Sequence, residues 1–233
     1  MTGEHSSKQY DQELEAIRSK VLLMGGMVET AFDEAMEAFR VGEAARADRV
    51  IADDQAVNQL EVQLDDACSH LIVRRQPTAN DLRTVMATIK VITDLERIGD
   101  EASKIARTAK NLHERNGTPF AHYDMVRTIS KATGDLLHNA LDAFARLDGK
   151  QALELIAADE VVDHEFRTIL RNLITFMMED PRTISSALDT LWVAKAIERI
   201  GDHAKNIAEY VIYVVEGRDI RHSKPAASEQ AVG

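Results

Sequence analysis

Cysteine is almost absent from this sequence of 233 residues, and aromatic residues, proline and glycine are scarce. The one cysteine, Cys68, excludes an internal disulfide. Aromatic residues make up 5% of the chain although 45% of it is hydrophobic, so its core must be built mainly from Leu, Ile, Val, Ala and Met. That composition favours helices over sheet.

Positive charge is also in short supply, because 28 Lys and Arg stand against 39 Asp and Glu. The net charge of −11 disfavours nucleic-acid binding, which usually needs a concentrated basic surface. No apolar run approaches the ~18 residues of a membrane span, and the first residues lack the basic start and apolar stretch of a secretory signal. We therefore expect a soluble, cytoplasmic protein.

Between the few glycines and prolines, apolar residues recur at steps of three and four, which is the period of a helix. This pattern predicts an all-α fold. The six expected helices span residues 8–40, 44–75, 80–114, 122–147, 150–179 and 183–216. Several exceed the usual length of a globular helix, which indicates coiled-coil packing or a helical repeat.

The two halves of the chain repeat one another. The letters E-R-I-G-D occur at 96–100 and again 102 residues later (198 − 96) at 198–202. The second and fifth helices align at an offset of 105, so the three-residue difference falls in the turn near "RRQPTANDL". We predict two tandem three-helix bundles of long antiparallel helices, with repeats at 1–117 and 118–220, a seam near 115–121 and a disordered tail at 221–233.

Each E-R-I-G-D stretch carries two acids four residues apart. Because a residue turns a helix by about 100°, Glu96 and Asp100 share one face, as do Glu198 and Asp202. Gly99 and Gly201 lie beside these faces. A mid-helix glycine costs about 1 kcal/mol of helix propensity, so we expect each to permit close approach of a second helix beside the carboxylates.

Matching polar pairs occur on the preceding helices, at Asp54 with Asn58 and at Asp159 with Asp163. Counted from Pro77, Asn58 (77 − 58 = 19) and Glu96 (96 − 77 = 19) are equally distant from the turn. The corresponding pairs around Pro181 agree within one residue. The facing side chains should therefore lie level across each hairpin.

Like charges held on facing helices raise carboxylate pKa values unless a cation compensates them. Oxygen donors of this kind suit Mg²⁺, Mn²⁺, Fe or Zn. The candidate metal ligands are Asp54, Asn58, Glu96, Asp100, Asp159, Asp163, Glu198 and Asp202. The structural alternative is a solvated acidic surface.

Neighbouring residues leave two points open. Arg97 and Arg199 follow candidate ligands and could form salt bridges with nearby acids such as Asp94 instead. His203 could add a ligand, although Glu101 stands at the matching place in the first repeat.

Motifs of several enzyme classes are missing. The sequence has no E-x-x-H element, which disfavours a ferritin-like di-iron centre, and it has no Walker loop, G-x-S-x-G or C-x-x-C. We expect Cys68 to be a small core residue.

The stretches "DLERIGDEASKIA" and "AIERIGDHAKNIAEY", together with "MGGMVETAFDEAMEAF" in the first helix, resemble the PhoU family over nearly the whole chain. The resemblance implies a cytoplasmic, commonly dimeric regulator that couples the phosphate ABC transporter and its ATPase subunit to a membrane sensor histidine kinase. It reaches the membrane only through these partners and represses the phosphate-starvation response. The family's acidic motifs bind multinuclear iron or zinc, and an acid is preferred where this sequence has Asn58.

The leading hypothesis is a non-enzymatic, metal-binding adaptor that also modulates phosphate uptake. One alternative is a metal-dependent phosphohydrolase, since adjacent cations can clamp a phosphoryl group. Another is an accessory protein of a different phosphate permease.

Overall fold

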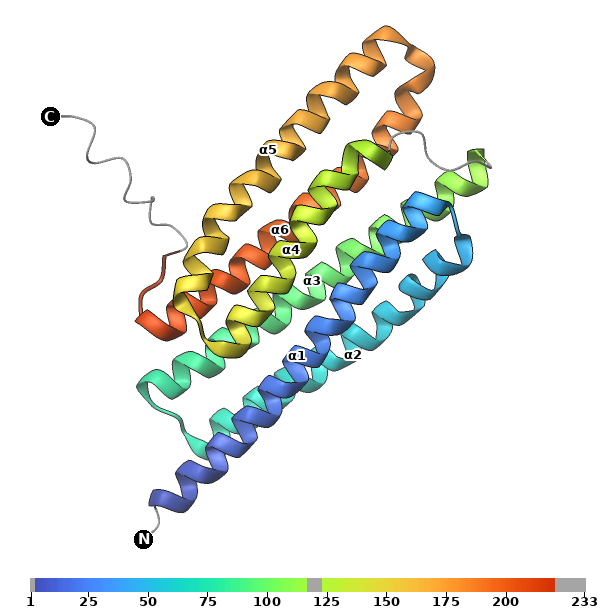
Figure 1. Cartoon of the computed structure of the whole chain (residues 1–233). Helices are drawn as coiled ribbons and strands as arrows, with labels where there is room; N and C mark the ends of the chain where they lie inside the picture. The colour runs from blue at the N-terminus through green and yellow to red at the C-terminus, as the bar shows by residue number, and fades with distance from the viewer. Residues whose placement is uncertain (1–2, 117–122, 221–233) are drawn as a thin grey trace, which may run out of the picture.

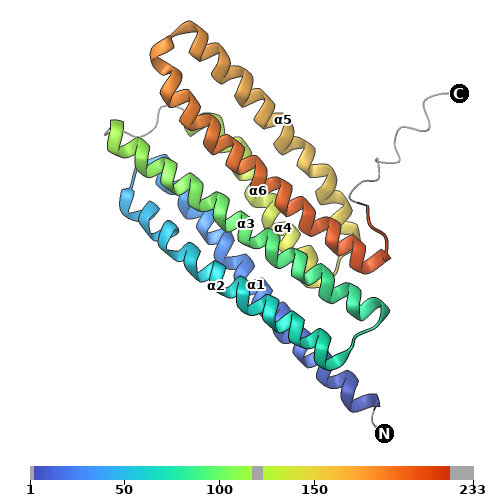
Figure 2. The same ribbon diagram turned by 180° about the vertical axis from the view of Figure 1, so that it is seen from behind.

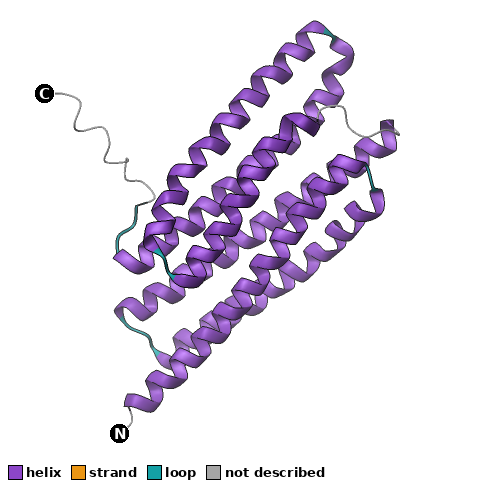
Figure 3. Ribbon diagram, viewed as in Figure 1, coloured by secondary structure: helices purple, strands orange, loops and turns teal. Residues whose placement is uncertain are grey.

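Helices account for nearly all of the residues that the computed structural model describes, which are 3–116 and 123–220. The elements are α1 (Gly3–Val41), α2 (Ala44–Arg75), α3 (Ala79–Asn116), α4 (Tyr123–Arg146), α5 (Gly149–Glu179), the short 3-10 helix η1 (Pro181–Thr183) and α6 (Ile184–Glu216). Within those ranges there is no strand (Figure 3). The all-α prediction is confirmed, and the predicted helices match these bounds closely. The division at 117/118, most of the predicted seam and the predicted tail lie outside the described residues.

Helices α3 and α6 each carry a stripe of seven apolar residues at alternating steps of four and three, and these stripes lie in the core. All seven stripe residues of α3 are buried, namely Val91, Leu95, Ile98, Ala102, Ile105, Ala109 and Leu112. Six of their seven α6 counterparts are buried as well: Val193, Ile197, Ile200, Ala204, Ile207 and Val211. Cys68 is also buried, which raises the pKa of its thiol to about 11 and confirms its assignment to the core.

The helices form two layers. Seen from behind, α2, α3, α6 and α5 lie side by side, and α1 and α4 cover their other face (Figures 1 and 2). The α3–α6 contact joins the two bundles, and these helices run antiparallel: Lys90 of α3 lies over the ring of Tyr210, and Glu101 pairs with Arg199. Helices α1 and α4 are also in contact. Gly25 of α1 lies so close to Leu141 of α4 that an added Cβ atom would clash with it.

Two turns set the register of the acidic residues. Gln76 ends α2 in the left-handed conformation with φ of 48° just before Pro77. At the equivalent turn the side chain of Asp180 accepts a hydrogen bond from the backbone N–H of Arg182. These turns join α2 to α3 and α5 to α6, and the helices of each pair pack against one another.

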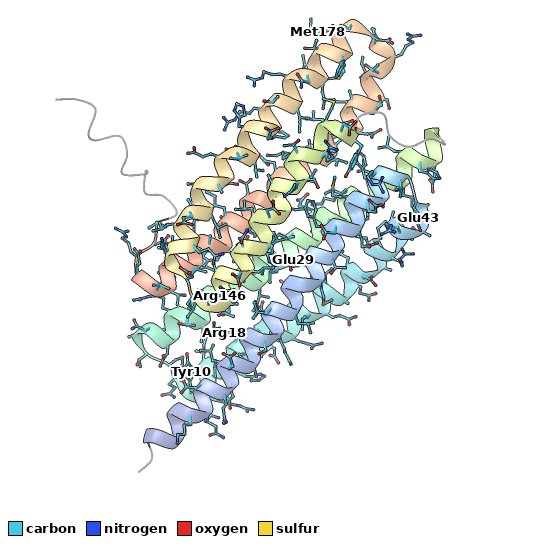
Figure 4. The ribbon with its side chains drawn as sticks, viewed as in Figure 1. Tyr10, Arg18, Glu29, Glu43, Arg146 and Met178 are labelled. Carbon is cyan, nitrogen blue, oxygen red and sulfur yellow. The ribbon has the colours of Figure 1, made fainter. Side chains whose placement is uncertain are left out.

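The two hairpins differ at their turn ends. In the first repeat α1 runs past the α2–α3 turn, where the Tyr10 hydroxyl donates to the backbone carbonyl of Asp81 (Figures 1 and 4). Helix α4 is shorter and does not reach the α5–α6 turn, so Met178 near that turn is exposed (Figure 4). The repeats therefore share a plan but present different surfaces. None of the helices described is long and apolar enough to cross a lipid bilayer.

Candidate metal centres

The second repeat brings three aspartates together in the α5–α6 groove. Each of Asp159, Asp163 and Asp202 offers a carboxylate oxygen, and the three oxygens lie within 4.8 Å of one another. Asp159 and Asp163 come from successive turns of α5, and Asp202 faces them from α6. Three of the four residues predicted as metal ligands in the second repeat therefore lie together across these two helices.

Repulsion and burial act together on Asp202. Its pKa is raised to about 6, first by burial and then by the charges of Glu198 and Asp159. Part of the carboxyl is therefore protonated near neutral pH unless a cation binds. A perturbed carboxyl at the mouth of an acidic groove is the signature expected of a ligand-binding position.

Basic side chains from the same helices partly compensate the aspartates. Lys205 Nζ lies 2.9 Å from Asp159 Oδ2, and Arg167 lies 3.0 Å from Asp163. Glu198, the fourth second-repeat candidate, forms an ion pair with Lys195. In this conformation Glu198 stands next to the three aspartates rather than among them.

Gly201 explains how the helices come so close. A Cβ atom built on Gly201 would lie 3.1 Å from Val162 Cγ1 and 3.5 Å from Asp159 Oδ1. At Gly99 the nearest atoms are Asp54 Oδ1 and Val57 Cγ1, both at 3.4 Å. Both glycines therefore lie beside an aspartate of the facing helix, as the sequence predicted.

The first repeat has a looser version of the site between α2 and α3. The pKa of Asp54 is raised by burial and by the charge of Asp100, which indicates that these two residues face one another. The pKa of Glu96 is raised for the same reasons, burial first and then Asp100. Among the described residues, Asp54 Oδ1 and Asn58 Oδ1 are buried without a hydrogen-bond partner.

The sequence reasoning missed two further acids in this groove, Glu61 and Asp65 of α2. The pKa of Glu61 is raised by burial and by Asp65, and Glu61 in turn raises the pKa of Glu96. Asp65 Oδ1 is buried and has no hydrogen-bond partner in the described part of the chain. Their four-residue spacing is visible in the sequence. It has no counterpart in the second repeat, where Phe166 and Leu170 occupy the matching positions.

A buried polar seam separates the two acidic grooves. His203 Nδ1 donates a hydrogen bond of 2.7 Å to Asp94 Oδ1 across α3 and α6. Arg199 pairs with Glu101 at 3.0 Å. His203 is thus directed at α3 rather than at the aspartates beside it. The expected ion pair between Arg97 and Asp94 is present at 3.8 Å.

The residues present fit a hard or borderline cation. Their donors are carboxylate and amide oxygens, as Mg²⁺, Mn²⁺, iron and Zn²⁺ accept. The buried oxygens of Asp54, Asn58 and Asp65 have no partner inside the described protein, and a buried acceptor left unpaired costs about 1–3 kcal/mol. A bound cation would satisfy them, so both grooves are candidate metal centres.

Comparisons with a family model and with known proteins point to the same family. A family model described as "PhoU domain" matches residues 21–109 and 126–211. The phosphate-specific transport system accessory protein PhoU homolog of Pseudomonas aeruginosa is 46% identical over 218 residues, which cover 94% of this chain and 90% of that protein. The phosphate-specific transport system accessory protein PhoU of Escherichia coli is 46% identical over 220 residues, covering 94% and 90%.

Two crystal structures share the fold. PhoU from Pseudomonas aeruginosa superposes with a TM-score of 0.86 at 46% identity, over 90% of this chain and 100% of the other. The phosphate transport system regulatory protein PhoU from Streptococcus pneumoniae gives a TM-score of 0.82 at 25% identity, over 90% of this chain and 98% of the other.

Proposed function

The chain belongs to the PhoU family, and we propose that it is a non-enzymatic accessory protein of phosphate-specific transport that represses the phosphate-starvation response. In this role it binds metal ions and acts as an adaptor. Its partners are the ATPase subunit of the phosphate ABC transporter and a sensor histidine kinase. It also modulates phosphate uptake, and it works as a homodimer in the cytoplasm.

The metal-binding part of the proposed function rests on the acidic cluster found at the same place in both repeats. In the second repeat three carboxylate oxygens gather within 4.8 Å. In the first, Asp54 and Asn58 present buried oxygens with no partner among the described residues. Duplication places the α2–α3 and α5–α6 helix pairs that carry these acids on either side of the α3–α6 contact (Figure 2).

The aspartates hold the hairpins in a defined arrangement. Asp159 and Asp163 belong to α5 and Asp202 to α6, so shared ligation ties these two helices together. A bound divalent or iron-type cation supplies the positive charge that compensates the aspartates. Because Asp202 is exposed and Asp163 half-buried, a partner surface can touch the same place and contribute ligands.

A deletion strain tests the regulatory role. Loss of the gene should make a phosphate-repressed reporter, such as alkaline phosphatase, constitutive in phosphate-rich medium. The wild-type gene on a plasmid should restore repression. Normal repression in the deletion strain would contradict the proposal.

Metal analysis tests the site. Native protein purified without chelators is compared by mass spectrometry of metals with a Glu198→Ala/Asp202→Ala variant. We expect the variant to lose the metal of the second repeat and to keep that of the first. A Glu154→Ala variant controls for general loss of surface acid, because Glu154 is an exposed residue of α5 outside the aspartate cluster. Equal metal content in all three proteins would identify the aspartates as ordinary surface charges.

A further inference from the structure

A second feature of the first repeat is an apolar groove between α1 and α2. It has a volume of about 820 Å³ and runs from Leu22 to Glu34 on α1, about 18 Å at 1.5 Å per residue. Its apolar lining includes Leu22, Leu23, Met27, Ala31, Val50, Ala56 and Val57. Leu23 is 61% exposed at its edge. A groove of this length and polarity matches three turns of an amphipathic helix.

Gly26 lies in the middle of this groove and has no packing partner. A Cβ added there would meet no atom within 4 Å, whereas at Gly25, the preceding residue, it would clash with Leu141. Glycine inside a helix costs about 1 kcal/mol relative to alanine. Packing within the chain explains Gly25 and leaves Gly26 unexplained. A second molecule approaching the α1 backbone would explain Gly26.

The second repeat has basic residues where α1 lines this groove with Leu22 and Gly26. A shift of 105 residues (126 − 21) relates the repeats at this point. It carries Leu22 onto Arg127 and Gly26 onto Lys131, and both basic residues line a pocket on the surface of α4. At these two positions the second repeat therefore does not share the lining of the α1–α2 groove.

Charges at the rim of the first groove indicate what it binds. Glu34 is already paired with Arg46. Arg49 and Asp53, one turn apart on α2, are both exposed and form no ion pair with the described residues. An occupant with an apolar face and a cation opposite Asp53 would complement this rim. The acidity of the whole chain, with a net charge of −11, favours a basic occupant further.

We infer that the α1–α2 groove is a docking site for a basic amphipathic helix of a partner protein. Leucine-like residues of that helix enter the hollow, its backbone passes over Gly26, and a lysine or arginine faces Asp53. This rests on the proposed regulatory function, for which it supplies a partner-binding surface. The groove lies between α1 and α2 and adjoins the first acidic cluster, since Asp54 and Gly99 line it, whereas the cluster between α5 and α6 is separate from it.

Binding of a model helix tests the inference directly. The probe is a fluorescein-labelled synthetic helix of about four turns, with leucines on one face and lysines beside them. Binding to the full chain is followed by anisotropy at about 0.15 M salt, where long-range charge effects are screened. A Gly26→Leu variant places a side chain in the hollow, where its Cβ would meet no atom within 4 Å, and should weaken binding by about tenfold. Leu153→Asp, at an exposed leucine of α5, is the control and should bind normally.

Two rim variants should act in opposite directions. Asp53→Lys should weaken binding of the basic probe, and Arg49→Glu should strengthen it. Melting curves and metal content identical to wild type would show that the variants are folded. Unchanged affinity in Gly26→Leu, or equal affinity for a probe of scrambled sequence, would overturn the inference. Sedimentation showing that Leu23→Asp converts a dimer to monomers would assign the groove to a second copy and would also overturn it.

A reporter strain separates this inference from the proposed function. If deletion of the gene makes the reporter constitutive, a plasmid that carries Gly26→Leu should fail to restore repression, while one that carries Leu153→Asp should restore repression. Full repression by Gly26→Leu would overturn the role of the groove and leave the regulatory function intact. If the deletion has no effect, the regulatory function fails, and the peptide measurement still decides whether the groove binds a helix.

Discussion

His203 of α6 donates a hydrogen bond of 2.7 Å to the carboxylate of Asp94 on α3, and both side chains are buried. The pair crosses the contact that joins the two repeats. Asp94 also accepts from the amide of Asn206 at 3.3 Å. This small polar network lies in the buried contact between α3 and α6, together with the Arg199–Glu101 ion pair, so its loss should destabilise the whole fold.

Replacing His203 with alanine should destabilise the protein by roughly 1–3 kcal/mol, because a buried acceptor loses its principal donor. Urea unfolding of the metal-free protein measures the change. A Thr168→Ala variant, at a hydroxyl that donates only to its own helix, serves as the control. An unfolding midpoint identical to wild type would show that Asn206 and Arg97 satisfy Asp94 without the histidine.

The two E-R-I-G-D glycines should respond differently to alanine. At Gly99 the new methyl group would make ordinary contacts at 3.4 Å, so Gly99→Ala should gain up to about 1 kcal/mol of helix propensity. At Gly201 it would press on Val162 at 3.1 Å and push α5 away from α6. Thermal melting and metal titration of the second site should show weaker metal binding only in Gly201→Ala. The reverse order would contradict this packing.

The raised pKa of Asp202 gives the metal-free protein a pH dependence of definite sign. The value is about 6 in the folded chain against 3.8 for the free carboxyl, so the folded state binds this proton more tightly. Its contribution to stability is complete below pH 3.8, falls as pH rises through about 6 and is absent above that. Melting temperatures of wild type and Asp202→Asn, measured from about pH 4 to about pH 6, the interval between the unfolded and folded pKa values, should diverge in slope. Parallel curves would refute the assignment.

Proton competition should act on metal binding in the same interval. Below about pH 6 Asp202 is mostly protonated, so affinity at the second site should fall as the pH is lowered. Titration with Mn²⁺ or Zn²⁺ at several pH values provides the measurement. An affinity independent of pH would place the metal elsewhere.

Glu61 and Asp65 should contribute to the first site. A Glu61→Gln/Asp65→Asn variant should bind less metal there, because it removes two of the acids that line the α2–α3 groove. The second site should be unaffected. The natural comparison is the second repeat, which has Phe166 and Leu170 at these places and gathers its acids at Asp159 and Asp163. Full metal content in the variant would confine the site to Asp54, Asn58, Glu96 and Asp100.

The sequence by itself determined the helices, their duplication and the faces on which the acids lie. These follow from local periodicity, since the helical repeat fixes the angle of each side chain about its own axis. Even the role of Gly99 and Gly201 could be predicted, because a missing side chain beside an acidic face leaves room for the backbone of a facing helix.

Only the tertiary structure decided which groups meet across helices. His203 forms a hydrogen bond with Asp94, and Glu198 forms an ion pair with Lys195. Glu61 lies near Glu96 in the first acidic cluster, at a position that is not acidic in the second repeat. The same holds for the groove at Gly26, which side chains of α1 and α2 line together. Such contacts depend on register and on rotamers, and these are set by packing among all six helices at once, beyond the reach of any single periodic pattern.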